Sequence, residues 1–325
     1  MARCRTRHCQ ARNCDLKSAA GSPITRGSLK KLNVIALQPD NNGSQYHDFT
    51  LDVRLRRPEI LPGRALSTPS FFIDIDGVLY GGSAPISKGP GVLAYLRSRG
   101  FPFLLVTNTS RMSASDIQEK LADLGYQVNT DEILPVSLAA VEYLTHKFDA
   151  ARCFLIGDDS LARLLEKHGH TVSRKEESAD AVVIGQSLWA NFGEIDIARR
   201  LALQGAEVIA LHRDATWPDG DVTRIGLGPI VAAIESVIDG TVTVIGKPQR
   251  AFFDAALSRA GFARADTVMI GDSIASDIDG AINADLRSLL VRTGNSAEEP
   301  VPAGCDGALN SIADLPKWCD AEFPD

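Results

Sequence analysis

Two carboxylates two residues apart, Asp74 and Asp76, end an apolar run that begins at Phe71, and Gly77 follows them. Because side chains in a β-strand alternate between its faces, residues two apart point to the same side. Holding two like charges together is costly unless a divalent cation lies between them or one carboxyl keeps its proton, and phosphoryl-transfer chemistry uses both devices. A strand end capped by solvated acids is the ordinary alternative for such a pair taken alone.

Three further apolar runs also end in polar side chains. They are followed by Thr107 and Asn108, by Lys247 after Gly246, and by Gly271 and Asp272 with Asp277 shortly beyond. Each group alone has an ordinary explanation as a helix N-cap, a solvated cation or a first-turn acid. Open α/β sheets bind their ligands at the carboxyl ends of the strands, so these groups together predict one common site.

From residue 71 onward, short β-rich runs alternate with amphipathic helical stretches. These elements must position the polar groups. Strands are expected at residues 71–75, 103–107, 152–156, 181–184, 207–211, 241–245, 267–270 and 288–291. Expected helices include 113–124, which starts with a capping-box pattern at Ser113, and 249–260, which follows Pro248. This alternation predicts an α/β fold with a doubly wound parallel sheet.

The charge of the chain is unevenly distributed. The formal net charge is −7, but residues 1–31 carry eight Lys and Arg against Asp15 alone, which leaves −14 for the rest. Cys4, Cys9 and Cys14 lie in the same basic tip without a CxxC pair, so a zinc site there is disfavoured. Residues 1–69 are therefore interpreted as a disordered N-terminal extension, and import into an organelle by its basic tip stays open beside a cytoplasmic location.

Composition also excludes several classes of partner. Phosphate backbones need a basic face, so the acidic chain predicts no nucleic-acid partner. Apolar runs such as residues 103–106 and 242–245 are far shorter than the ~18 residues that span a bilayer, so no membrane partner is expected. Six cysteines in 325 residues do not indicate a secreted disulfide framework.

The four motifs together resemble those of the haloacid-dehalogenase-like hydrolase superfamily over roughly residues 70–320. The motifs are Asp74-Ile75-Asp76-Gly77, Thr107-Asn108, Lys247, and Gly271-Asp272 through Asp277. Some 139 residues separate Asn108 from Lys247, which is where the NagD-like subfamily inserts an α/β cap. The resemblance implies a Rossmann-like core of residues 70–148 and 229–321, a smaller α/β cap of residues 149–228, and a homodimer through that cap. Within that subfamily, the motif residues of the chain resemble those of the phospholysine phosphohistidine inorganic pyrophosphate phosphatase-like branch.

The same resemblance implies roles for the two acids of the first motif. Asp74 is the nucleophile that forms an aspartyl-phosphate, and Asp76 is the general acid and then the general base. Mg²⁺ would be held by Asp74, the backbone carbonyl of Asp76, and Asp272. Oxygen ligands without His or Cys in the motifs favour Mg²⁺ over Zn²⁺.

The remaining motif residues receive supporting roles. Thr107, Asn108 and Lys247 would donate to the phosphate oxygens of the substrate. Asp277 orients Lys247 or supports the metal shell, with a first-turn acid as its alternative, while Gly77 and Gly271 give the backbone room to turn.

Two positions depart from the family pattern. Relatives often carry Asn-x-Asp after the last cap strand, where this chain has His212, Arg213 and Asp214. His212 and Arg213 are candidates to reach an anionic leaving group, with a plain surface loop as the alternative. Asp285 stands where relatives have a helix-ending glycine, at which a left-handed residue is expected.

The resulting prediction is a Mg²⁺-dependent phosphatase, a hydrolase of phosphoric monoesters or phosphoanhydrides, that acts on small phosphorylated metabolites. An alternative within the enzymes is a phosphatase for pyrophosphate or for the phosphoramidates phospholysine and phosphohistidine. A receiver-type module that only accepts phosphate on an aspartate is the alternative from another class, and a catalytically silent scaffold is a further one.

Overall fold

The computed structural model describes residues 30–38, 45–53, 68–175, 177–219 and 222–324. The chain divides into two compact units, Met1–Ala65 and Leu66–Asp325. In the first, β1 (Lys30–Gln38) and β2 (Gln45–Val53) pair as an antiparallel hairpin that the sequence patterns did not predict. Most of the basic tip, with Cys4, Cys9 and Cys14, lies outside the described residues.

The first sheet of the second unit consists of parallel strands in the order β17-β16-β15-β3-β6-β7. The strands are β3 (Ser70–Asp74), β6 (Phe103–Thr107), β7 (Ile133–Pro135), β15 (Thr267–Gly271), β16 (Arg287–Val291) and β17 (Gly307–Leu309). From β3 the chain moves outward through β6 and β7, then returns to β15 on the other side of β3. This topological switch point confirms the doubly wound parallel sheet and is the usual place for a ligand in such folds.

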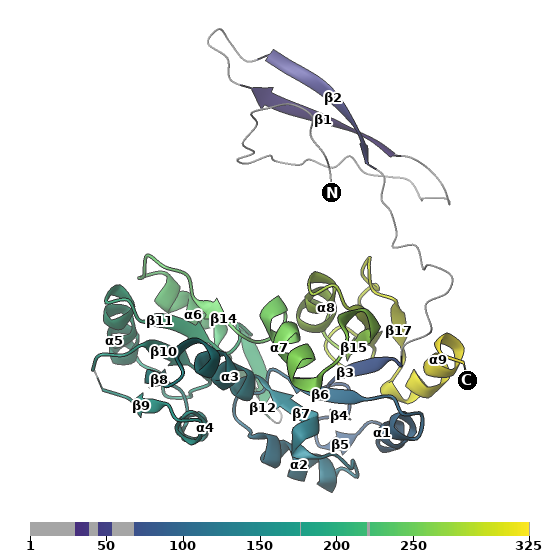
Figure 1. The fold of residues 1–325 in the computed structure, drawn as a ribbon, viewed down its shortest axis with the longest axis horizontal. Helices are drawn as coiled ribbons and strands as arrows, with labels where there is room; N and C mark the ends of the chain where they lie inside the picture. The colour runs from purple at the N-terminus through teal and green to yellow at the C-terminus, as the bar shows by residue number, and fades with distance from the viewer. Residues whose placement is uncertain (1–29, 39–44, 54–67, 176, 220–221, 325) are drawn as a thin grey trace. The chain divides into compact units, whose positions relative to one another are not determined.

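The second sheet is also parallel, in the order β14-β11-β10-β8-β9 (Figure 1). Its strands are β8 (Arg152–Ile156), β9 (Thr171–Ser173), β10 (Ala181–Ile184), β11 (Glu207–Ala210) and β14 (Thr243–Val244). Because β14 pairs with β11, this sheet takes its edge strand from beyond residues 149–228. Two antiparallel pairs complete the strands: β4 (Tyr80–Gly81) with β5 (Ala84–Pro85), and β12 (Thr216–Asp219) with β13 (Val222–Ile225).

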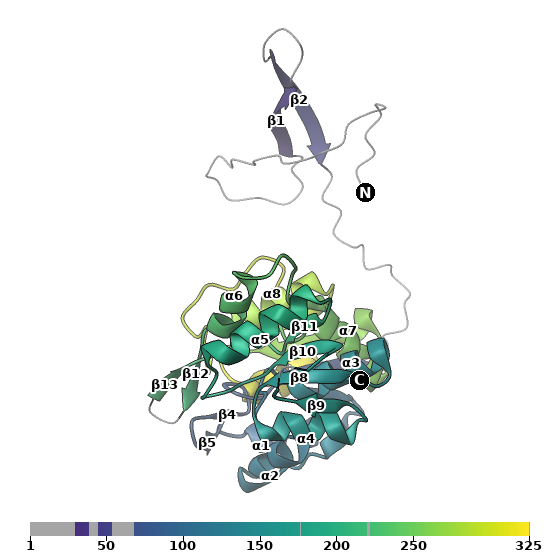
Figure 2. The same cartoon turned by 90° about the vertical axis from the view of Figure 1, so that its left-hand side faces the viewer.

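Helices cover both sheets. They are α1 (Gly89–Ser98), α2 (Ala114–Asp123), α3 (Val136–Phe148), α4 (Asp159–Lys167), α5 (Phe192–Leu203), α6 (Gly228–Glu235), α7 (Arg250–Ala260), α8 (Asp279–Asn283) and α9 (Leu315–Glu322). Figure 2 shows α5 in front of β10 and β11, which it contacts. Helix α3 contacts α7 and β7 of the first sheet and α4 of the second, so it lies where the two sheets meet. No helix within the described ranges is long and apolar enough to cross a bilayer.

Strand β3 is buried on both faces because its side chains alternate between two hydrophobic clusters. Phe71 and Ile73 pack in a cluster with α1, α2 and α9, and Phe72 packs in a cluster with α3, α7 and α8. All three side chains are fully buried, which explains why the run is continuously apolar. The second cluster continues into the second sheet, so one core joins the two sheets.

Local signals in the sequence set several element ends. Ser113 caps α2, with the capping box to Asp116 formed in both directions, as expected. Asp285 has the left-handed φ of 56° that was expected where relatives carry glycine. Its carboxylate accepts a hydrogen bond from Arg250 at 2.7 Å, which anchors the end of α8 to the start of α7.

Candidate active site

A buried lysine joins two of the predicted acids. Lys247 Nζ lies 2.7 Å from Asp74 Oδ1 and 2.8 Å from Asp277 Oδ1. The three side chains are 2%, 10% and 0% exposed, respectively. Because a buried charge is stable only when it is paired, the lysine and the two carboxylates hold one another in place.

Lys247 reaches the first sheet although it follows β14, the edge strand of the second sheet. Asn108, just after β6, makes two hydrogen bonds with the Lys247 backbone. Its Oδ1 accepts from the Lys247 N–H at 2.9 Å, and its Nδ2 donates to the Lys247 carbonyl at 3.0 Å. A Cβ on Gly246 would collide with Asn108 Oδ1 at 2.6 Å, so the glycine lets the two segments meet.

Asp272 follows β15 and is held by the loop after β16. Its Oδ2 accepts hydrogen bonds from the Asn295 backbone N–H at 2.6 Å and from Asn295 Nδ2 at 2.9 Å. Glycines lie against the carboxylate on two sides, since a Cβ on Gly77 or on Gly294 would overlap Asp272 Oδ2. Gly77 also has a φ of 78°, so this position favours glycine for two separate reasons.

Asp277 enters the cluster from a π-helical turn, Ile274–Ile278, that begins directly after Ser273. Its Oδ2 accepts from the Ser273 N–H at 3.1 Å, while Oδ1 faces Lys247. Gly271 is required here because a Cβ on it would overlap the Asp277 side chain. Asp277 is therefore a buried partner of Lys247 and not the solvated first-turn acid of the alternative interpretation.

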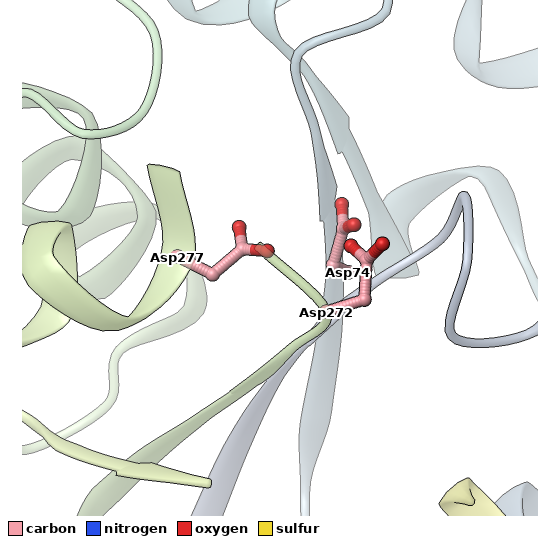
Figure 3. Close-up of side chains that lie close together, drawn as sticks. All are labelled: Asp74, Asp272 and Asp277. Atoms are coloured by element: carbon pink, nitrogen blue, oxygen red, sulfur yellow. The ribbon is translucent and has the colours of Figure 1, made fainter. Parts of the chain in front are cut away.

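Asp74, Asp272 and Asp277 form an acidic cluster that fits a hard divalent cation. One carboxylate oxygen from each residue lies within 4.8 Å of the others. Figure 3 shows the carboxylates of Asp74 and Asp272 side by side, with that of Asp277 directed toward them. The three buried carboxylates outnumber the one lysine, which pairs with Asp74 and Asp277. Carboxylate oxygens gathered in this way suit Mg²⁺.

Burial changes the proton affinity of these groups. It raises the pKa of Asp74 well above the ordinary value of 3.8, although the nearby Lys247 ammonium opposes this. It also raises the pKa of Asp272, and the Asp277 carboxylate adds to that increase. For Lys247, burial lowers the pKa, but the Asp277 and Asp74 carboxylates outweigh it and the pKa is raised. The lysine therefore stays charged, while Asp74 and Asp272 resist ionisation when no cation is bound.

Asp76 lies outside this cluster, with an exposed side chain. Its Oδ1 accepts a hydrogen bond from the Tyr80 hydroxyl at 2.5 Å, and that hydroxyl accepts one from Lys120 Nζ at 2.8 Å. Burial raises the pKa of Tyr80, with the Asp76 carboxylate contributing, so the phenol keeps its proton. The two acids of the first motif therefore have different environments, one buried and one accessible to solvent.

Thr107 and Asn108 both lie at the carboxyl end of β6, as expected, but their side chains differ in use. Thr107 Oγ1 is buried and accepts from the Thr109 N–H at 3.0 Å, which leaves its own proton to donate. The side-chain amide of Asn108 is engaged with Lys247 through both of its polar atoms.

The loop after β11 contacts the site through Asp214. Asp214 Oδ2 lies 3.0 Å from His212 Nδ1 and 3.5 Å from Asn108 Nδ2. Burial favours a raised pKa for Asp214, but His212, through its hydrogen bond and its charge, together with Asn108 and Lys247 outweighs burial, and the pKa is lowered. Arg213 instead pairs with Glu235 of α6, with Nη1 2.8 Å from Oε2. Asp214 and His212 therefore lie near the motif residues, while Arg213 is bound to a helix.

Sequence reasoning missed three residues of this site: Tyr80, Lys120 and Asn295. Tyr80 follows the first motif by three residues, where an aromatic side chain reads as part of the core. Lys120 lies mid-helix in α2, and Asn295 lies in a loop after β16. No spacing rule marks such residues, because only the tertiary fold brings them to Asp76 and Asp272.

Comparison with known proteins gives the chain a family. Residues 71–171 match the family described as haloacid dehalogenase-like hydrolase, and residues 244–315 match the one described as HAD-hydrolase-like. The haloacid dehalogenase-like hydrolase domain-containing protein 2 of Bos taurus is 34% identical over 223 residues, covering 68% of this chain and 83% of that protein.

Two other relatives are named as a nucleotidase and a phosphatase. The 5'-nucleotidase YutF of Bacillus subtilis is 27% identical over 252 residues, covering 76% of this chain and 96% of that protein. The structure of p-nitrophenyl phosphatase from Archaeoglobus fulgidus matches with a TM-score of 0.72 at 27% identity, covering 77% of this chain and 99% of that one. The structure is also similar to that of a putative nagD protein, with a TM-score of 0.71 at 26% identity. The chain therefore belongs to the haloacid dehalogenase-like hydrolases.

Proposed function

We propose that the protein is a Mg²⁺-dependent phosphatase that hydrolyses small phosphorylated metabolites through an aspartyl-phosphate on Asp74. The observation that carries the proposal is the buried Asp74 carboxylate, which Lys247 holds at 2.7 Å beside Asp272 and Asp277. This arrangement lies at the switch point of a parallel sheet, where a substrate can reach it. Membership in a hydrolase family sets aside the receiver-type alternative.

Asp74 acts as the nucleophile in the first step. Lys247 occupies its Oδ1, which leaves the other oxygen to form a bond to phosphorus while the bond from phosphorus to the leaving oxygen breaks. Asp76 gives its proton to that leaving oxygen. Because Asp76 is exposed and Asp74 is buried, one carboxyl can exchange protons while its neighbour attacks.

The second step restores the enzyme. Asp76 takes a proton from water as the water oxygen bonds to phosphorus, and the bond between phosphorus and Asp74 breaks. The Lys247 ammonium, the Thr107 hydroxyl and the backbone N–H of Asn108 would donate to phosphoryl oxygens in both steps. In this proposal the Asn108 side chain has a positioning role toward Lys247 rather than a contact with substrate.

Asp74, Asp272 and the backbone carbonyl of Asp76 would hold the cation, with Asp277 in support through Lys247. A bound Mg²⁺ would neutralise the excess negative charge of the cluster and polarise a phosphoryl oxygen. The excess of buried carboxylates over lysine is the feature of this chain that supports a cation here.

The test is a time course of phosphate release from p-nitrophenyl phosphate. Many phosphates per chain are expected with Mg²⁺, and none with excess EDTA. Release of one phosphate per chain, or of none with Mg²⁺, would contradict the proposal, as would full activity in EDTA. A panel with a nucleoside monophosphate, a sugar phosphate, pyrophosphate and phospholysine then ranks the substrate classes, including the pyrophosphate and phosphoramidate alternative. The cytoplasmic location, the domain boundaries and the homodimer through the cap remain predictions.

A further inference from the structure

A chain of two hydrogen bonds leads to Asp76 from outside the acidic cluster. Lys120 Nζ on α2 donates to the Tyr80 hydroxyl at 2.8 Å, and that hydroxyl donates to Asp76 Oδ1 at 2.5 Å. None of the four sequence motifs contains Lys120, which lies within helix α2. The general acid proposed above is therefore connected to a cation that the four motifs do not supply.

The direction of these hydrogen bonds is determined by the chemistry of the groups. An ammonium can only donate, so Tyr80 must accept from Lys120. A phenol carries a single proton, and with its acceptor side occupied by Lys120, that proton is left for Asp76. Asp76 Oδ1 is consequently an acceptor, and the other carboxyl oxygen, Oδ2, is the one left to carry a proton.

Tyr80 is held rigidly enough to impose this geometry. Its side chain is 6% exposed, and its carbonyl accepts from the Gly77 N–H at 2.9 Å. Tyr80 also forms a β-bridge with Asp76 itself. Lys120 Nζ lies 3.9 Å from the centre of the phenol ring, so the cation packs on the ring as well as bonding its hydroxyl.

We propose that Tyr80, oriented by Lys120, is a positioning residue that fixes the Asp76 carboxyl so that Oδ2 exchanges the proton with the leaving group. This inference rests on the proposed phosphatase function and deepens it. The Asp76 side chain is exposed, and nothing in the motif itself fixes its rotation. Tyr80 and Lys120 would supply that orientation.

Orientation of the acid by Tyr80 affects substrates differently, which a merely structural role of Tyr80 would not do. An alkyl alkoxide needs a proton as it leaves, whereas p-nitrophenolate is a stable anion and needs little help. Loss of a correctly oriented acid therefore slows the cleavage of alkyl phosphates more than that of p-nitrophenyl phosphate. The quantity to follow is kcat/KM, which reports the first bond-breaking step, expressed as the ratio of an alkyl phosphate to p-nitrophenyl phosphate.

The test compares Tyr80→Phe and Lys120→Met with a matched control, Tyr95→Phe. Tyr95 makes the same kind of network, since its hydroxyl accepts from Arg99 at 3.1 Å and donates to Asp320 at 2.6 Å. With glycerol 2-phosphate as the alkyl substrate, Tyr80→Phe should lower the ratio about tenfold, the size of one hydrogen bond to an ionisable group. Lys120→Met should lower it in the same direction but less, and Tyr95→Phe should leave it unchanged.

A double variant shows whether Tyr80 acts through Asp76. In an Asp76→Asn background, Tyr80→Phe should cause no further change in the ratio, because effects that pass through one residue are not additive. An equal loss of kcat/KM on both substrates, or the same fall of the ratio in the Asp76→Asn background, would overturn the inference. The proposed phosphatase function would still stand if the wild type turns over. A wild type without turnover would overturn both.

Discussion

Asp272 lies in an excess of negative charge, so replacing its carboxylate by a neutral amide should change the stability of the protein in a predictable direction. In Asp272→Asn, the side-chain oxygen still accepts from Asn295, as Oδ2 does at 2.6 and 2.9 Å in the wild type. The new amide group takes the place of a carboxylate oxygen beside Asp74 and Asp277. Without a metal ion, we expect this variant to be more stable than the wild type, although it alters a fully buried site residue.

The magnitude follows from the spacing of the charges. The carboxylate oxygens lie within 4.8 Å of one another, and at such a distance two unit charges at an effective dielectric constant of ~20 repel by about 3 kcal/mol. Asp272 faces two acids and one lysine, so about one such repulsion remains. Its raised pKa means that proton uptake already relieves part of it. A gain of about 1–2 kcal/mol is expected, which raises Tm by about 2–6 °C in a chain of this size.

Mg²⁺ should reverse this order. A ligand that binds only the folded state at a hundred times its Kd stabilises the protein by about 2.7 kcal/mol. The wild type should gain this amount, whereas Asp272→Asn lacks a carboxylate ligand and should gain little. The wild type is therefore expected to be the less stable protein in EDTA and the more stable one in saturating Mg²⁺.

The assay is thermal unfolding of both proteins in EDTA and across a Mg²⁺ titration. Asp239→Asn, which neutralises an exposed acid elsewhere, is the control for net charge and should track the wild type in both conditions. A lower Tm for Asp272→Asn in EDTA, or an equal gain from Mg²⁺ in both proteins, would refute this account of the acidic cluster.

Three further predictions address other parts of the site. Lys247→Met removes the cation between Asp74 and Asp277, so kcat/KM for p-nitrophenyl phosphate should fall about 10³-fold, and calorimetry should show a loss of about 3–5 kcal/mol of stability; unchanged kinetics would contradict its role. Asn108→Ala loses both hydrogen bonds to the Lys247 backbone and should lower kcat/KM about 10- to 100-fold, while the gain in Tm from Mg²⁺ persists; loss of that gain would place Asn108 in the metal site instead. Because the pKa of Asp272 is raised above 3.8 in the folded protein, its destabilising charge is absent below that pH and grows as pH rises. In EDTA, the stability advantage of Asp272→Asn should therefore be small at pH 4 and increase toward pH 8, and an advantage that shrinks with pH would contradict the charge argument.

The part of the site that could be predicted lies at strand ends. Parallel strands present their carboxyl ends at one edge, so apolar runs that end in Asp74, Thr107 or Asp272 indicate a shared location before any coordinates are known. The same logic predicted the parallel sheet itself, which the structure confirms. The capping box at Ser113 was equally predictable, because its partners are only three residues apart.

The rest depends on contacts that sequence spacing does not encode. Lys247 follows a strand that joins the second sheet, and two hydrogen bonds from its backbone to Asn108 hold it beside the first sheet. Asp277 lies within a π-helical turn, which displaces it from the direction of an ordinary first turn. Tyr80 and Lys120 meet across the space between a short strand and a helix. These pairings are set by tertiary packing, which no local pattern fixes.

The most direct measurement of the central claim is phosphate release by Asp74→Asn beside the wild type, with p-nitrophenyl phosphate and saturating Mg²⁺. The Asn amide is not a nucleophile that can form the acyl-phosphate, yet it preserves the shape that Lys247 contacts at 2.7 Å. We expect many turnovers by the wild type and no detectable release by a folded Asp74→Asn. Turnover by Asp74→Asn near the wild-type rate would contradict this expectation.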